Sequence, residues 1–149
     1  MARVRRRRGR IQLQLDSDER AAIRGIVDQL SPHLGHVART VPVAYADAEM
    51  QKEYDHWVRP ELDRGREADL EVIRHCLDSG EDMAPLTEAQ TLAWVRGLNH
   101  LRLAAGALLG VEQDGWEQNP DEAMRGHSEY REILALGFLQ EELIAALES

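Results

Sequence analysis

A long apolar segment behind a helix-start signal constrains the fold of this chain most. The signal is Thr87-Glu88-Ala89-Gln90, in which a threonine and the glutamine three residues later have the form of a capping box. Behind it, apolar side chains recur at helical spacing over residues 88–109, and they form a central stripe of Trp94, Leu98, Leu101, Ala105 and Leu108. The stripe is widened by Leu92, Leu103, Ala104 and Leu109. So broad an apolar surface predicts a helix surrounded by other helices.

Two further helices are predicted on the N-terminal side of this segment. Asp16 and Ser17 are good N-cap residues for a helix that ends at Leu30, before Ser31-Pro32. Its apolar residues are Ala22, Ile23, Ile26, Val27 and Leu30. Pro60 suits the first turn of the other helix, which runs to about Ser79 before a stop at Gly80. This helix is expected to bury Leu62, Leu70, Ile73 and Leu77.

The remaining helical patterns lie in the middle and at the end of the chain. Residues 47–57 have helical period, and Ser128 precedes a final helix over about 129–147. The apolar residues of the final helix are Tyr130, Ile133, Leu134, Phe138, Ile144 and Leu147. Residues 31–44 and 110–127, rich in Pro, Gly, Asp or Asn, are expected to be loops, the first with one more helical turn at most.

The first fifteen residues differ from the rest. Polar and apolar residues alternate from Arg10 to Leu15, which predicts a half-buried strand. With Gly9 as a turn, residues 4–8 would be its hairpin partner, and the alternative is a frayed terminus. The predicted fold is therefore mainly α: one helical domain over 11–149, a single-domain bundle, with an Arg-rich strand or tail over 1–10 that forms a small N-terminal β-hairpin or stays unpaired.

Charge is distributed unevenly along the chain. Six of the 18 basic residues lie in the first ten positions, which leaves 12 basic against 27 acidic residues, a net charge of −15, in the remainder. Any polyanion must therefore be bound by the N-terminal arginines, with Arg5, Arg6, Arg7 and Arg8 as candidates. No aromatic residue is interleaved with them to stack on bases. We favour arginines that pair with the protein's own acidic surface, and keep nucleic-acid binding as the alternative.

Several function classes find no support in the residues. The single Cys76 excludes an intramolecular disulfide and a multi-cysteine zinc site, and no apolar run is long enough to span a membrane. His33 and His36 have the spacing of metal ligands but lack a third, so we interpret them as structural or exposed. No phosphate-binding Gly loop, nucleophile elbow or HExxH pair is present. We therefore expect a cytoplasmic protein that is not an enzyme and needs no cofactor, metal or membrane.

Two small groups of residues remain as candidates for function. Asn99 and Arg102 share a face of the apolar helix near His100, and we expect Arg102 to be partly buried and paired with a carboxylate outside its own helix. The partners considered are Glu141, Gln140, Glu53 and Asp55. The alternatives are a structural ion pair and a ligand or partner site. Cys76 follows His75 near a helix C-terminus, which does not activate a thiol, so we interpret it as a partly buried small residue.

The segment from Trp94 to Gly106 resembles the signature of an actinobacterial family. It is similar to the pattern W-x-x-x-L-N-D-L-R-L-x-L-G, with His100 in place of the usual Asp and Ala105 in place of the usual Leu. Pro42 to Tyr45, the acidic segment around Tyr54 and Leu139 to Leu143 match in order, so that the resemblance covers about residues 11–147. The family was long filed as a domain of unknown function and is now described after AosR, an oxidative-stress regulator.

The resemblance implies a non-enzymatic regulator of transcription that acts through a protein partner, such as a stress sigma factor or RNA polymerase. The redox form of that role uses two cysteines in one chain, so the single Cys76 does not carry it over. Candidate structural or partner-binding residues are Asn99, Arg102, Trp94 and Glu141, and Cys76 is the redox candidate. Nucleic-acid binding through the arginines and an uncharacterised small-ligand site are the alternatives, and a homodimer is left open.

Overall fold

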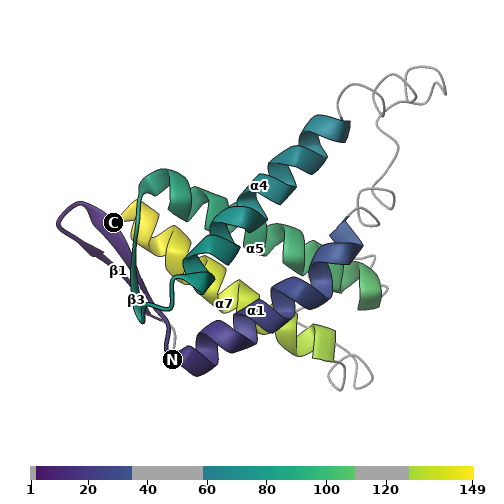
Figure 1. The fold of residues 1–149 in the computed structure, drawn as a ribbon, viewed down its shortest axis with the longest axis horizontal. Coiled ribbons are helices and arrows are strands. Elements are labelled where there is room, and N and C mark those ends of the chain that lie inside the picture. The colour runs from purple at the N-terminus through teal and green to yellow at the C-terminus, as the bar shows by residue number, and fades with distance from the viewer. Residues whose placement is uncertain (1–2, 35–58, 110–127) are drawn as a thin grey trace.

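A computed structural model describes residues 3–34, 59–109 and 128–149 (Figure 1). This part of the chain is mainly helical, with a small antiparallel sheet of three strands at one end of the molecule. The helices are α1 (Ser17–Leu30), a 3-10 turn η1 (Ser31–His33), α4 (Arg59–Asp78), α5 (Glu88–Leu109) and α7 (Ser128–Glu148). The helix predicted over 47–57, the loop over 110–127 and most of the segment 31–44 lie outside the described residues.

The predicted N-terminal hairpin is confirmed. Strand β1 (Arg3–Arg7) pairs with β2 (Arg10–Gln14), one residue earlier in β1 than the pattern suggested. Arg8 and Gly9 connect them with φ angles of 54° and 77°. Positive φ at both central residues is the mark of the two-residue turn whose twist matches paired strands.

A third strand, β3 (Met83–Leu86), was not predicted. It pairs with β2 in the register Leu13 to Ala84 and Ile11 to Leu86, and the N–H of Leu15 donates to the carbonyl of Asp82 at 2.8 Å. That bond places the backbone groups of Ala84 and Leu86 towards β2 and turns those of Pro85 to the outer edge of the sheet. A proline is tolerated there because it has no N–H to donate.

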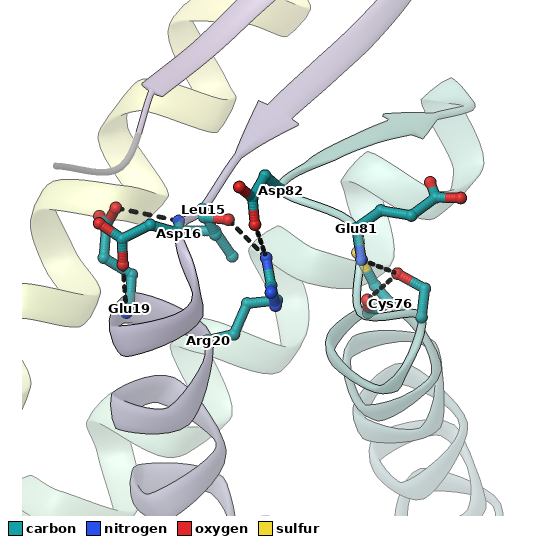
Figure 2. Close-up of polar contacts among 8 residues, drawn as sticks. Leu15, Asp16, Glu19, Arg20, Cys76, Glu81 and Asp82 are labelled. Carbon is teal, nitrogen blue, oxygen red and sulfur yellow. Dashed lines mark hydrogen bonds and ion pairs between the residues drawn. The ribbon is translucent and has the colours of Figure 1, made fainter.

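Helix α1 begins at the predicted cap. The Asp16 side chain accepts from the N–H of Glu19 at 2.8 Å, and the Glu19 carboxylate accepts from the N–H of Asp16 at 3.2 Å (Figure 2). Arg20 connects α1 to the sheet. Its guanidinium donates to the carbonyl of Leu15 at 2.8 Å and to the carboxylate of Asp82 at 2.6 Å. The start of α1 and the entry to β3 are thereby held together.

Helix α5 lies at the centre of the helical layer and packs against α1, α4 and α7. Its predicted capping box is confirmed, with Thr87 and Gln90 exchanging hydrogen bonds of 2.9 and 3.1 Å. Helix α4 ends before Gly80, whose φ of 73° gives the left-handed stop that was expected. At Gly97, a Cβ would lie 2.5 Å from Cδ1 of Ile73, so the glycine permits the close approach of α5 to α4.

The predicted core is correct at its centre and wrong at several edges. Trp94, Leu98 and Leu101 are fully buried, whereas Leu92, Leu103 and Leu108 are 45%, 52% and 42% exposed. In α7 the buried residues are Ile133, Leu136, Leu139, Gln140, Leu143 and Ala146, while Leu134, Phe138 and Ile144 are exposed. Leu62 of α4, also expected inside, is 49% exposed. Helices α5 and α7 carry apolar residues on both faces, so the period alone did not select the side that faces the core.

None of the helices in the described ranges is both long enough and apolar enough to cross a bilayer.

Candidate functional site

The signature helix α5 is joined to α7 by a buried polar contact. Nη1 of Arg102 donates to Oε1 of Gln140 at 2.6 Å, and Nε2 of Gln140 donates to the carbonyl of Val95 at 3.1 Å. Gln140 is only 8% exposed, and the Arg102 guanidinium lies over Gly137, where a Cβ would be 3.5 Å from its Cζ. Arg102 is therefore half-buried and bridges two helices, as predicted.

The identity of the partner differs from the first expectation. Of the residues considered, Gln140 makes the hydrogen bond through a neutral amide, while Glu141 beside it points to solvent and is exposed. Glu53 and Asp55 lie outside the described residues. An amide fits because it accepts from Arg102 and donates to Val95 at once, which a carboxylate cannot do.

A second buried polar contact joins α5 to α4 and was not predicted. Asp69 is 7% exposed and accepts from Nη2 of Arg96 at 3.0 Å and from Nε of Arg96 at 3.1 Å. Nε2 of His100 lies 3.5 Å from the same carboxylate. Burial lowers the pKa of His100, and the negative charge of Asp69 opposes this shift without cancelling it. The missed signal was Asp69 itself, an acidic residue beside Leu70 and four before Ile73 on the apolar side of α4.

The predicted partner residues separate into two classes. Trp94 is fully buried in the core and has no surface to offer a partner. Asn99 is exposed, and with Leu92 and Leu103 it forms a stripe along α5 at spacings of seven and four residues. Glu141 lies with Leu134 and Phe138 in a similar exposed stripe along α7. We call these six residues the outer face of α5 and α7.

The two stripes run beside each other. Arg102, next to Leu103, reaches across to Gly137, next to Phe138. The contact therefore marks the seam between α5 and α7 beside Leu103 and Phe138, and two further large apolar side chains, Leu92 and Leu134, lie along the same stripes. Their exposed fractions are 45% for Leu92, 52% for Leu103, 44% for Leu134 and 46% for Phe138.

Cys76 lies in a shallow groove between α4 and β3, with a volume of about 560 Å³. Apolar residues make up much of its wall, among them Val72, Ala84 and Leu86, and the charged members are Glu71 and Glu81. At this end of α4, Oγ of Ser79 donates to the carbonyl of Cys76 at 2.8 Å. Burial raises the pKa of the half-buried thiol more than the neighbouring Trp94 side chain lowers it. A thiol in this setting is mostly protonated and a poor nucleophile.

The N-terminal arginines divide between the two faces of the hairpin. Arg6 points inward, and its Nε donates to the carbonyl of Ala146 in α7 at 3.1 Å. Its Nη2 lies 3.4 Å from the carboxylate of Glu88 at the start of α5. Arg5, Arg7 and Arg8 are exposed and make no ion pair within the described residues. Among these arginines, the described residues show pairing with an acidic side chain for Arg6, whose guanidinium is therefore less available to a polyanion than those of Arg5, Arg7 and Arg8.

The described ranges contain no group of three His, Cys, Asp or Glu side chains that could hold a metal ion. His33 is half-buried in η1, and His36 lies outside the described residues.

Comparison with known proteins gives one result. A family model described as "Domain of unknown function (DUF2017)" matches residues 1–147. No curated protein and no solved structure matches the chain.

Proposed function

The chain therefore belongs to the DUF2017 family, and we propose that it is a non-enzymatic regulatory protein that acts by binding a protein partner through the outer face of α5 and α7. The observation that carries this proposal is the exposure of Leu92, Leu103, Leu134 and Phe138 along the two stripes. Large apolar side chains gathered in one place on a soluble surface mark contact sites more often than isolated ones do.

The outer face of α5 and α7 has the mixture of apolar and polar side chains that is typical of a protein–protein interface. Leucine and phenylalanine side chains supply apolar area, whose burial stabilises a complex by roughly 25 cal/mol per Å² before the costs of association. Asn99 and Glu141 lie among them and supply polar groups that a partner can hydrogen-bond. The Arg102–Gln140 contact keeps the two helices in fixed register, so the surface is already formed before binding.

The resemblance to the oxidative-stress regulators suggests the class of partner. We propose a stress sigma factor or RNA polymerase in the cytoplasm, with a transcriptional role. This chain has one cysteine, so the proposed regulation does not use a disulfide closed within the chain.

The test uses purified partners and single substitutions on the outer face. Leu103→Glu and Phe138→Glu place a charge where an apolar contact is expected, and binding to the host's stress sigma factors and RNA polymerase is measured by biolayer interferometry. We expect either substitution to weaken binding at least tenfold. The matched control is Leu62→Glu, because Leu62 is 49% exposed on α4, away from the seam.

Three outcomes would contradict the proposal. One is the absence of binding to any of these purified partners, and another is equal loss of binding in Leu62→Glu. The third is a homodimer, seen by sedimentation, that Leu103→Glu dissociates, because the outer face would then serve self-association.

A further inference from the structure

We propose that the outward face of the β1–β2 hairpin binds the phosphate backbone of duplex DNA. The strand register defines this face. Arg3 lies opposite Gln14, Arg5 opposite Gln12 and Arg7 opposite Arg10, and residues that lie opposite each other point to the same side. Val4 and Arg6 point to the other side, towards the core and α7. The outward face thus carries four arginines and two glutamines, and Arg8 adds a fifth arginine at the turn.

These five arginines differ from the other basic residues. In the described ranges, the side chains of Arg3, Arg5, Arg7, Arg8 and Arg10 make no hydrogen bond or ion pair, although the chain is rich in acidic residues. By contrast, Arg6, Arg20, Arg24, Arg66, Arg74 and Arg96 each contact a carboxylate. The donors of the hairpin face are therefore available to a ligand.

The arrangement of these arginines is also energetically unfavourable when no ligand is bound. Arg7 and Arg10 are like charges directly opposite each other, and Arg8 adopts a positive φ of 54° between them. A ligand with several negative charges removes the repulsion. Arg7, Arg8, Arg10 and Gln12 line a hollow of about 490 Å³ with Pro85, so that their side chains converge on one place. The hairpin tip projects from the body of the molecule (Figure 1), which leaves room for a bulky partner.

The chemistry of the face favours duplex DNA among the polyanions. No aromatic side chain lies on it, which removes the stacking by which single strands are bound. Guanidinium groups bind phosphate oxygens in pairs, and duplex DNA presents about one negative charge per 1.7 Å of its axis. The hairpin tip, which extends beyond the residues of β2 that pair with β3, is a two-stranded ribbon. The DNA major groove admits such a ribbon, whereas the major groove of duplex RNA is too deep and narrow for side chains.

Salt dependence is the quantitative signature of such binding. The rest of the chain is acidic and opposes DNA, so affinity must come from the arginines and be greatest at low salt. With a slope of about −0.9 for each phosphate neutralised, five contacts predict a loss of roughly 500-fold between 50 and 200 mM KCl.

The experiment measures fluorescence anisotropy of a labelled 20-base-pair DNA duplex with the full chain. The test variant is Arg7→Gln/Arg10→Gln, and the control is Arg64→Gln/Arg131→Gln, which removes the same charge from exposed positions on α4 and α7. We expect the test variant to bind about tenfold more weakly at 50 mM KCl, with a slope reduced by about 1.8. The control should retain most of the affinity. Because Arg7 and Arg10 repel each other, the test variant should unfold at the same temperature as the wild type or higher.

Other outcomes would overturn the proposal. They are no binding by the wild type at 50 mM KCl, or an equal loss in the control variant. Tighter binding of single-stranded DNA or duplex RNA of the same length would point to another nucleic acid. Competition by polyglutamate as strong as that by unlabelled duplex would assign the face to acidic proteins instead.

Discussion

Gln140 shows how one buried side chain can fix the register of two helices. Its amide accepts from Arg102 and donates to Val95, both on α5, from a position on α7 that is 8% exposed. Sequence reasoning placed Arg102 at a helix contact because a cation among Leu98, Leu101 and Ala105 needs a partner. The sequence alone could not decide whether Gln140 or Glu141 is the partner. Adjacent residues point about 100° apart around a helix, and the side of α7 that faces α5 was unknown.

Removing this amide should destabilise the fold. Gln140→Ala removes the buried amide that accepts from Arg102 and donates to the carbonyl of Val95. The loss of these two hydrogen bonds should lower the free energy of unfolding by about 1–3 kcal/mol. The measurement is urea unfolding followed by circular dichroism. Glu141→Ala is the control, since an exposed neighbour should change stability by less than about 0.5 kcal/mol. Equal effects of the two substitutions would show that the amide contact contributes little.

His100 should make stability depend on pH. Its pKa is lowered in the folded protein, mainly by burial, so between this lowered value and about 6.5 the unfolded chain binds more protons than the folded one. Stability should therefore fall as pH is lowered through this range, and His100→Gln should flatten that part of the curve. Urea midpoints taken from pH 7.5 to 5 measure the effect. An unchanged slope in the variant would mean that other groups cause the dependence.

At the scale of elements, capping and turn residues were the most informative part of the sequence. Asp16, Thr87 and Gly80 each lie where the pattern predicted, because a cap is a local interaction within a few residues. Strand β3 was missed for the opposite reason. It has only four residues and includes Pro85, and it becomes a strand through pairing with β2, about seventy residues earlier in the chain.

The cap of α5 provides a test at this scale. Thr87→Ala removes the acceptor for the N–H of Gln90 and should cost about 0.5–2 kcal/mol of the free energy of unfolding. Ser17→Ala is the matched control, since Ser17 follows the cap of α1 and Asp16 makes the capping bond there. Thermal and urea unfolding measure both variants. A Thr87 variant as stable as the Ser17 variant would contradict the capping role.

For the molecule as a whole, the broad apolar surface of α5 predicts its central position. Which elements pack against α5 depends on contacts between segments distant in the sequence, and no single segment reveals them. The exposed leucines of α5 were grouped with its core stripe, and Phe138 with the apolar residues of the final helix. A pattern records that a residue is apolar and does not record whether a neighbour covers it. The arginines were visible as a cluster, but only the pairing of β1 with β2 shows that Arg6 faces inward while four others share the outer side.

Any redox response of this chain should require a second molecule. Cys76 is its single cysteine, and burial raises the pKa of the thiol, so the reactive thiolate is scarce at neutral pH. We expect Cys76 in the folded protein to react with Ellman's reagent at pH 7.5 more slowly than free glutathione, and at a comparable rate once the chain is unfolded in guanidinium. Mild peroxide should give little disulfide-linked dimer on non-reducing gels, and none with Cys76→Ser. Fast dimerisation that depends on Cys76, or a change in partner affinity on oxidation, would instead show that the groove between α4 and β3 exposes a sensing thiol.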